Sequence, residues 1–199
     1  MAIINIPKLI PSQIAWANRP SAANNYGMVI EVSNIGTNGS YWVSNGTRWM
    51  PMNGDITLAN VNSTYSHTGT VAETTLATVT IPGGVMGTSS RIEVIALFST
   101  TNSANTKTIK VKFGGTSYYS VNSTTINAVT TVTNICNNKS TSSQIGSGGN
   151  SSAGIGSATV AAVTSSADTT QDVALTFTGT LANSGENISL LGYTVILRA

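Results

Sequence analysis

The sequence predicts an all-β protein: an antiparallel jelly-roll sandwich preceded by a short β-hairpin spacer and an extended N-terminal arm. Three observations predict this class. Apolar and polar residues alternate with a period of two through most of residues 71–199, as in strands with one buried face. Helix signals are almost absent. Gly, Pro and Asn clusters interrupt the alternation at the short intervals typical of antiparallel sandwiches.

Residues 1–27 come first and are predicted to form the arm. They contain three prolines and show no clear hydrophobic period. Pro-rich arms commonly lie on another surface or stay mobile. Lys8 follows the first apolar residues, which is not the order of a secretory signal. The longest apolar run, residues 94–98, is too short to cross a bilayer, so no membrane insertion is expected.

Residues 28–70 are predicted to form a small β spacer followed by a linker. Asn45-Gly46 is a strong signal for a two-residue type I′ turn, which would pair Trp42 directly with Trp49. A region this small is not expected to bury two indoles alone. Trp42 and Trp49 are therefore predicted to be buried by other subunits or by the sandwich beneath them, with the role between subunits favoured, and the alternative is that they fold back within their own chain.

Residues 71–199 are predicted to form the head domain. Eight strands in two packed sheets is the jelly-roll number. The last predicted strand is apolar on both faces, so it is either central in the sandwich or covered by a neighbouring subunit. A Gly/Ser-rich loop is expected at residues 139–157. The predicted strands cover residues 74–81, 91–99, 106–113, 116–121, 127–136, 159–164, 172–178 and 188–198.

The composition narrows the possible partners. Only 8% of the residues are charged, against about 25% in ordinary domains, and Ser, Thr and Asn fill the polar positions. The net charge of +2 comes from scattered residues, so nucleic acid is not an expected partner. A surface of hydroxyls and amides suits neutral partners such as sugars, and it equally suits any soluble β-protein.

Catalytic and metal-binding patterns are weak. His67, the single histidine, falls in the predicted linker and is expected to be solvated. Cys136 is the single cysteine, so no internal disulfide can form. Together they are too few for a metal site. Asp168 and Asp172 offer two carboxylates for glycoside cleavage, but the Asp-Thr-Thr sequence favours turn capping by Asp168. No enzyme activity, cofactor or metal is predicted.

Candidate receptor contacts come from two predicted strands of the head. Lys107, Lys110 and Lys112 could meet lipopolysaccharide phosphates, or could protect an exposed strand edge from pairing. Tyr118 and Tyr119 are adjacent on a strand and therefore face opposite ways. One ring could stack on a sugar while the other enters the core. The receptor-contact candidates are therefore Tyr118, Tyr119, Lys110 and Lys112.

The segments TLATVTIPGG, SSQIG and SADTTQDVALTF occur in this order. With the surrounding residues 18–199, they resemble the jelly-roll head domain and β spacer of tailed-bacteriophage fibre and minor structural proteins. The resemblance implies a homotrimer in a phage virion, assembled in the cytoplasm of the bacterial host, and contact with the bacterial surface.

A non-enzymatic, trimeric tail fibre is therefore expected. Its arm would dock on another phage structural protein, and its head would meet a bacterial surface glycan. Two alternatives remain open at this point: a head fibre or capsid decoration protein, and, less favoured, a polysaccharide-degrading enzyme.

Overall fold

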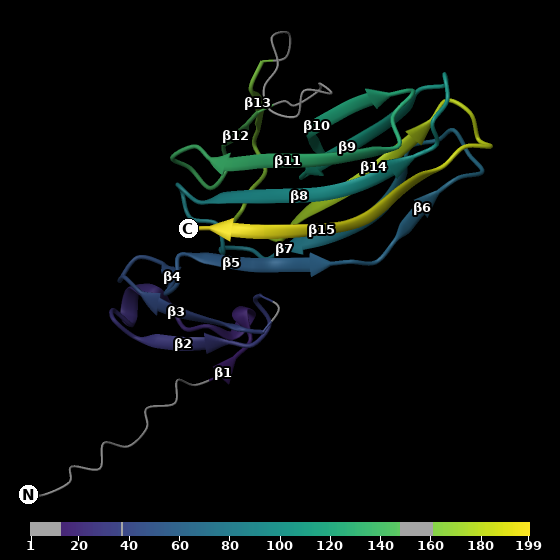
Figure 1. Ribbon diagram of the computed structural model, residues 1–199. Coiled ribbons are helices and arrows are strands. Elements are labelled where there is room, and N and C mark those ends of the chain that lie inside the picture. Colours follow the sequence, from purple (N-terminus) through teal and green to yellow (C-terminus); the bar gives the residue numbers. More distant parts are fainter. Residues whose placement is uncertain (1–12, 37, 148–160) are drawn as a thin grey trace, which may run out of the picture. The chain divides into compact units, whose positions relative to one another are not determined.

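The computed structural model describes residues 13–36, 38–147 and 161–199. The chain divides into two compact units, residues 1–54 and residues 55–199. Most described residues lie in strands (Figure 1). The first part of the predicted arm, residues 1–12, lies outside the described residues, as does much of the predicted Gly/Ser loop.

The first unit is built on a four-stranded sheet with the order β1-β2-β3-β4. β1 pairs parallel to β2, and the other pairs are antiparallel. Residues 13–27 are not an extended arm, contrary to prediction. They form β1 and two short 3-10 helices, Trp16–Asn18 and Ala22–Asn24, whose first residues are buried. The strands are β1 (Gln13–Ile14), β2 (Val29–Val32), β3 (Ser40–Ser44) and β4 (Trp49–Pro51).

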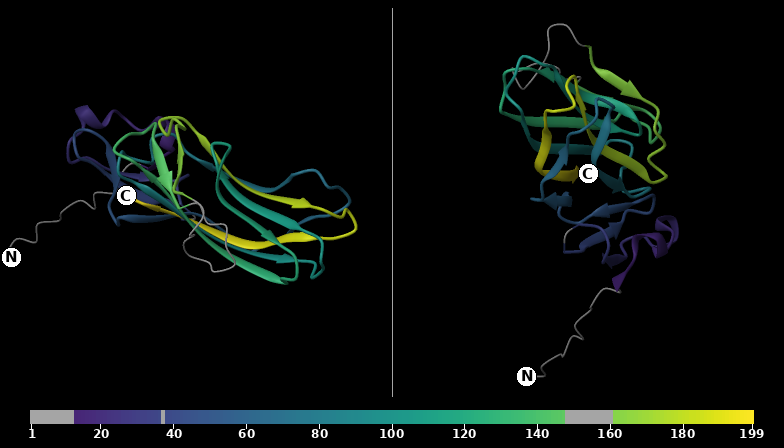
Figure 2. Two further views of the ribbon diagram at one scale, coloured as in Figure 1. Left: turned by 90° about the horizontal axis from the view of Figure 1, so that it is seen from above. Right: turned by 90° about the vertical axis from the view of Figure 1, so that its right-hand side faces the viewer.

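The second unit is a sandwich of two sheets, which Figure 2 shows as separate layers. The small sheet has the order β10-β9-β14-β7. The large sheet has the order β13-β12-β11-β8-β15-β5, and β6 also pairs with β15. The small sheet consists of β7 (Thr74–Ile81), β9 (Lys107–Phe113), β10 (Thr116–Ser123) and β14 (Val173–Leu181). The large sheet consists of β5 (Asp55–Val61), β6 (Tyr65–His67), β8 (Arg91–Thr100), β11 (Ala128–Asn137), β12 (Gln144–Gly146), β13 (Val163–Ser165) and β15 (Ile188–Arg198).

The eight long strands of this unit pair in a regular order. The first of them pairs with the last (β5 with β15), the second with the seventh (β7 with β14), the third with the sixth (β8 with β11), and the fourth with the fifth (β9 with β10). This is the order of one long hairpin folded over into two sheets. The predicted all-β antiparallel sandwich is confirmed, and from the pairing order we infer the finer jelly-roll connection.

The boundary between the two regions differs from the prediction. Residues 55–61 and 65–67 were expected in the spacer and linker, but they form β5 and β6 of the large sheet. Both strands pair with β15. The polar sequence of residues 61–70 hides β6, because its strand conformation depends on a partner more than 120 residues away. The apolar last strand is therefore central in its sheet, one of the two predicted alternatives.

The core of the sandwich lies between its sheets. Ile92, Val94, Ala96 and Phe98 of β8 are all fully buried on one face, as their spacing predicts. Phe177 of the small sheet joins the two layers. Its ring centroid lies 6.4 Å from that of Phe98 and 4.7 Å from that of Tyr193, both in the large sheet.

Candidate functional site

The hairpin of β3 and β4 has a different register from the predicted one. Trp42 pairs with Pro51, and Ser44 pairs with Trp49. Residues 45–48 therefore form a four-residue loop instead of a two-residue type I′ turn. The two indoles remain on the same face of the sheet, because a shift of two residues preserves the alternation, but they are not directly opposite each other.

The side chain of Asn45 accounts for the wider loop. Its Oδ1 accepts hydrogen bonds from the backbone N–H groups of Thr47, at 2.9 Å, and Arg48, at 2.8 Å. Gly46 has a φ of 82°, whereas Asn45 keeps a negative φ. A type I′ turn needs positive φ at both central residues, so side-chain capping by Asn45 replaces that turn.

Both indoles are buried in the single chain. Trp42 exposes 0% and Trp49 5% of its surface. The ring of Trp42 lies 4.5 Å from that of Trp16, centroid to centroid, and its Nε1 donates to Ser40 Oγ at 2.7 Å. Trp49 Nε1 donates to the carbonyl of Pro20 at 2.8 Å. The expectation that the indoles need other subunits to cover them is wrong, because both are buried in the single chain and Trp16 and Pro20 contact them.

Lys110 and Lys112 lie on the outer face of the small sheet, where they share the carboxylate of Glu73. Their Nζ atoms are 3.1 Å and 2.5 Å from the two Glu73 oxygens. Lys112, followed by the hydroxyl of Thr178, lowers the pKa of Glu73 to about 2. The edge-protection alternative is wrong, because β9 lies between β10 and β14. Each lysine keeps about a quarter of its side chain exposed, so a polar ligand can still reach it.

Tyr118 and Tyr119 do not face opposite ways. They expose 0% and 4% of their surfaces. The register of β10 against β9 shifts between Ser117 and Tyr119, so a β-bulge breaks the alternation. The hydroxyls of Tyr118 and Ser165 share a hydrogen bond of 2.7 Å, and burial raises the pKa of both tyrosines. Neither ring is available for sugar stacking, so both receptor-contact predictions are wrong.

Lys107 points into the protein instead of outward. It is fully buried, and its Nζ lies 3.7 Å from Glu186 Oε2 and donates to Ser103 Oγ at 2.9 Å. Glu186 Oε1 accepts from Asn105 Nδ2 at 2.9 Å and from the Ser103 hydroxyl. The group joins the loop before β9 to the loop before β15. A buried lysine is tolerated only when it is paired in this way.

The carboxylates considered for catalysis are engaged in turns. Asp168 Oδ1 accepts from the N–H of Thr170 at 3.0 Å and from its hydroxyl at 2.7 Å, which confirms the capping role. Asp172 Oδ1 accepts from the N–H of Gly83 at 2.8 Å. His67 is only 3% exposed on β6, so the expectation of a solvated histidine is wrong.

Within residues 13–36, 38–147 and 161–199, no three His, Cys, Asp or Glu side chains gather in a way that could hold a metal ion. No helix in that part of the chain has the length and hydropathy to cross a membrane.

The outer face of the large sheet carries apolar side chains that sequence reasoning missed. Ile95 and Leu97 of β8 are 38% and 41% exposed, and Val132 of β11 is 39% exposed. Val132 pairs directly with Ile95. Ile145 of β12, 37% exposed, lies on the same face farther along, opposite Cys136. The signal in the sequence was the apolar run of residues 94–98, because a strand with one wet face should alternate.

Comparisons with known proteins give little further information. No protein-family model and no curated protein matches the chain. One similar solved structure is described as "Structure of infectious bursal disease virus Gx strain", with 15% sequence identity and a TM-score of 0.26. The match covers 72% of this chain and 39% of that chain, so this chain spans about two fifths of the other's length. A similarity at this level carries no argument about function.

Proposed function

We propose that the chain is a structural protein of a bacteriophage virion, a homotrimeric tail fibre that contributes to attachment to a host-surface glycan. The observation that carries the proposal is the order of its parts. A small β unit precedes an eight-strand sandwich, and the segments that resemble phage fibre heads, residues 75–116, 142–146 and 166–197, all belong to the sandwich. A spacer followed by a β-sandwich head is the organisation that the resemblance implies.

The contacts of the carboxylates support a binding role over a catalytic one. Glycoside cleavage needs two carboxyl groups facing one substrate. Asp168 and Asp172 instead accept hydrogen bonds from backbone N–H groups of turns. Glu73 and Glu186 are paired with lysines. These four groups serve the fold.

The outer face of the small sheet is the best surface for a glycan. Lys110 and Lys112 remain from the predicted receptor contacts, and hydroxyl side chains surround them, including Thr176 opposite Lys112 and Ser120 opposite Lys110. Hydroxyls and ammonium groups can bond sugar hydroxyls and phosphates. Binding by one such face is weak, and three copies per fibre with many fibres per particle would raise the avidity.

Two experiments test this proposal. Antibody labelling of intact particles in electron micrographs should place the protein on the tail, and labelling of the capsid would assign it as a head fibre or decoration protein. Beads carrying arrayed protein should bind host cells. Replacing both lysines, K110Q/K112Q, should lower this binding at least tenfold, while Thr78→Gln on the same face should leave it unchanged. Beads that never bind host cells or their purified surface glycans would contradict the receptor role.

A further inference from the structure

The large sheet presents an apolar surface to solvent at its centre. Ile95 and Leu97 alternate on β8, and Val132 lies beside Ile95 on β11. Figure 1 shows this face toward the viewer, with β11, β8, β15 and β5 side by side. We call Ile95, Leu97 and Val132 the outer apolar row. In soluble proteins, the face of a sheet that contacts water is ordinarily polar. A group of adjacent exposed apolar side chains marks a surface that binds a partner.

Folding of the single chain does not account for this row. β9 of the small sheet has the same alternation as β8, yet its outward side chains are Thr108, Lys110 and Lys112. That sheet folds with polar groups at its outer positions. A covered face explains the choice of isoleucine, leucine and valine on β8 and β11.

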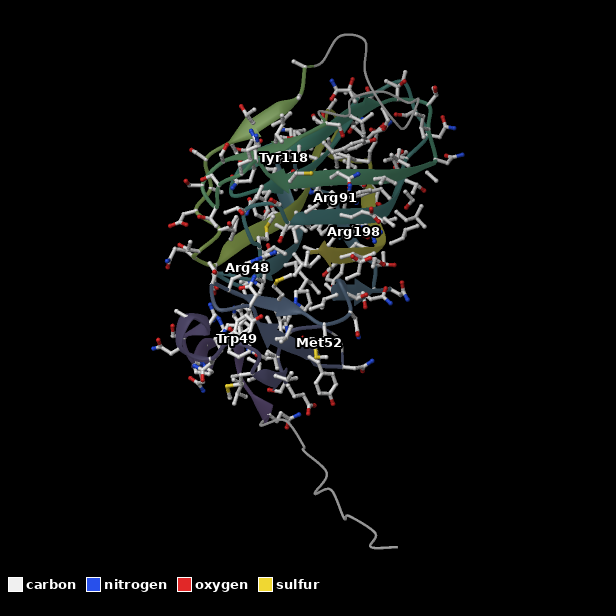
Figure 3. The ribbon with its side chains drawn as sticks, turned by 90° about the vertical axis from the view of Figure 1, so that its left-hand side faces the viewer. Arg48, Trp49, Met52, Arg91, Tyr118 and Arg198 are labelled. Atoms are coloured by element: carbon white, nitrogen blue, oxygen red, sulfur yellow. The ribbon has the colours of Figure 1, made fainter. Side chains whose placement is uncertain are left out.

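The charges around the row favour an identical chain as the covering partner. At one end, Arg198 Nη2 lies 2.8 Å from Glu93 Oε1, and Arg198 also pairs with Asp55. Arg91 lies opposite Arg198 in the register, and Figure 3 shows the two at this end of the sheet. Two cations and two anions leave this group with no net charge. A second copy of the chain therefore meets no net repulsion between like charges. A strongly charged partner would find no net charge of opposite sign on this surface.

The area of the face is sufficient for a stable contact. β8 has ten residues, so it is about 33 Å long, and four paired strands span about 19 Å. The flat footprint is therefore about 600 Å², close to the roughly 800 Å² per partner of a standard interface. Because the side chains project from the sheet, the area buried per partner would be larger than this flat footprint.

We propose that the outer face of the large sheet, centred on the outer apolar row, packs against a second copy of this chain. Its assignment as one contact of a homotrimer rests on the proposed function above. Leu97 is the residue chosen for the test, because it lies on an internal strand and has the largest exposure of the row.

Sedimentation equilibrium of the full chain tests the proposal. The wild type should self-associate at micromolar concentration. Leu97→Lys should weaken that association by about 100-fold or more, because an unpaired ammonium would be buried in the contact. The matched control is Ala174→Lys, which places the same charge on an exposed position of β14, an internal strand of the small sheet, and should leave association unchanged. Leu97→Thr retains β propensity and should weaken association by about tenfold. Far-UV circular dichroism confirms that each variant is folded.

The outcomes separate this inference from the proposed function. A folded wild-type monomer overturns the interface together with the homotrimer of the proposed function. An oligomer that Leu97→Lys and Leu97→Thr leave intact assigns assembly to another face and also overturns it, while the proposed function stands. If the Leu97 variants self-associate normally but fail to enter particles, the row contacts another virion protein, which contradicts the proposed contact between copies of this chain. Loss of association in a protein that antibodies never find on particles keeps the interface and rejects the proposed function.

Discussion

The outer faces of the two sheets of the sandwich differ, although their inner faces are alike. Inside, both sheets present aliphatic and aromatic residues to one shared core. Outside, β9 presents Lys110 and Lys112, neutralised in part by Glu73, whereas β8 presents Ile95 and Leu97. The inner faces are apolar because folding buries them in the core. The outer faces are not buried by folding, so we relate their difference to the surroundings of each face.

The two proposed functions lie on different faces of one sandwich. The proposed glycan surface is the hydroxyl- and lysine-bearing face. The proposed contact with another copy of the chain is the neutral apolar face. The shared core makes the two faces parts of one cooperative structure, so that a change in the core should affect both and a change outside should affect one.

The largest expected effect comes from breaking the shared core. Phe177→Ala removes the ring that joins β14 to Phe98 and Tyr193. The free energy of unfolding should fall by about 3–5 kcal/mol. Urea denaturation followed by far-UV circular dichroism measures this value. A loss of less than about 1 kcal/mol would mean that the sheets do not share one core.

A smaller effect is expected on the polar face, and it depends on pH. The pKa of Glu73 is lowered to about 2 from 4.5, so its ionised form stabilises the folded protein. This contribution is complete above pH 4.5 and is lost as the pH falls toward 2. Glu73→Gln should lower the free energy of unfolding at pH 7 by about 0.5–1 kcal/mol. The free energy of unfolding of this variant should also fall less steeply than that of the wild type as the pH is lowered.

Thermal unfolding at several pH values between neutrality and strong acid measures the Glu73 contribution. Salt is the internal control, because screening should reduce the difference at neutral pH. Equal acid sensitivity of wild type and Glu73→Gln would show that the lysines do not hold this carboxylate in solution.

The smallest effect on stability is expected on the apolar face. Val132→Thr places a hydroxyl side chain on this face, as the outer face of the small sheet already has. Because Val132 is 39% exposed and threonine suits strands, the stability of the dilute monomer should change by no more than about 0.5 kcal/mol. Denaturation at nanomolar protein measures it. A loss of several kcal/mol would show that the row serves the fold of its own chain.

Much of the sandwich was predictable because its strands follow local rules. Strands at residues 74–81 and 188–198 were found with the predicted bounds. Alternation specified the faces of both, and Pro82-Gly83 ended the first. By contrast, β5 and β6 form only through pairing with β15, and such long-range pairing leaves little trace in a short polar sequence.

The candidate site was less predictable for the same reason. The indole of Trp42 is covered by Trp16, 26 positions away in the sequence, so reasoning from the hairpin alone left it exposed. One extra residue in β10 turned both Tyr118 and Tyr119 inward, and a bulge of this kind has no strong local signal. The outer apolar row was visible as a run without alternation, but only the sheet order places it on an outer face.

Cys136 gives the most direct test of the covered face. It is the only cysteine of the chain, is partly exposed, and lies on the outer face opposite Ile145 and Arg91. Its alkylation by a maleimide can be timed in native protein across a range of concentrations. The account predicts that labelling of the wild type slows by about tenfold or more as the protein self-associates, whereas Leu97→Lys is labelled at the fast rate throughout. A wild-type rate that stays constant through assembly would contradict the account.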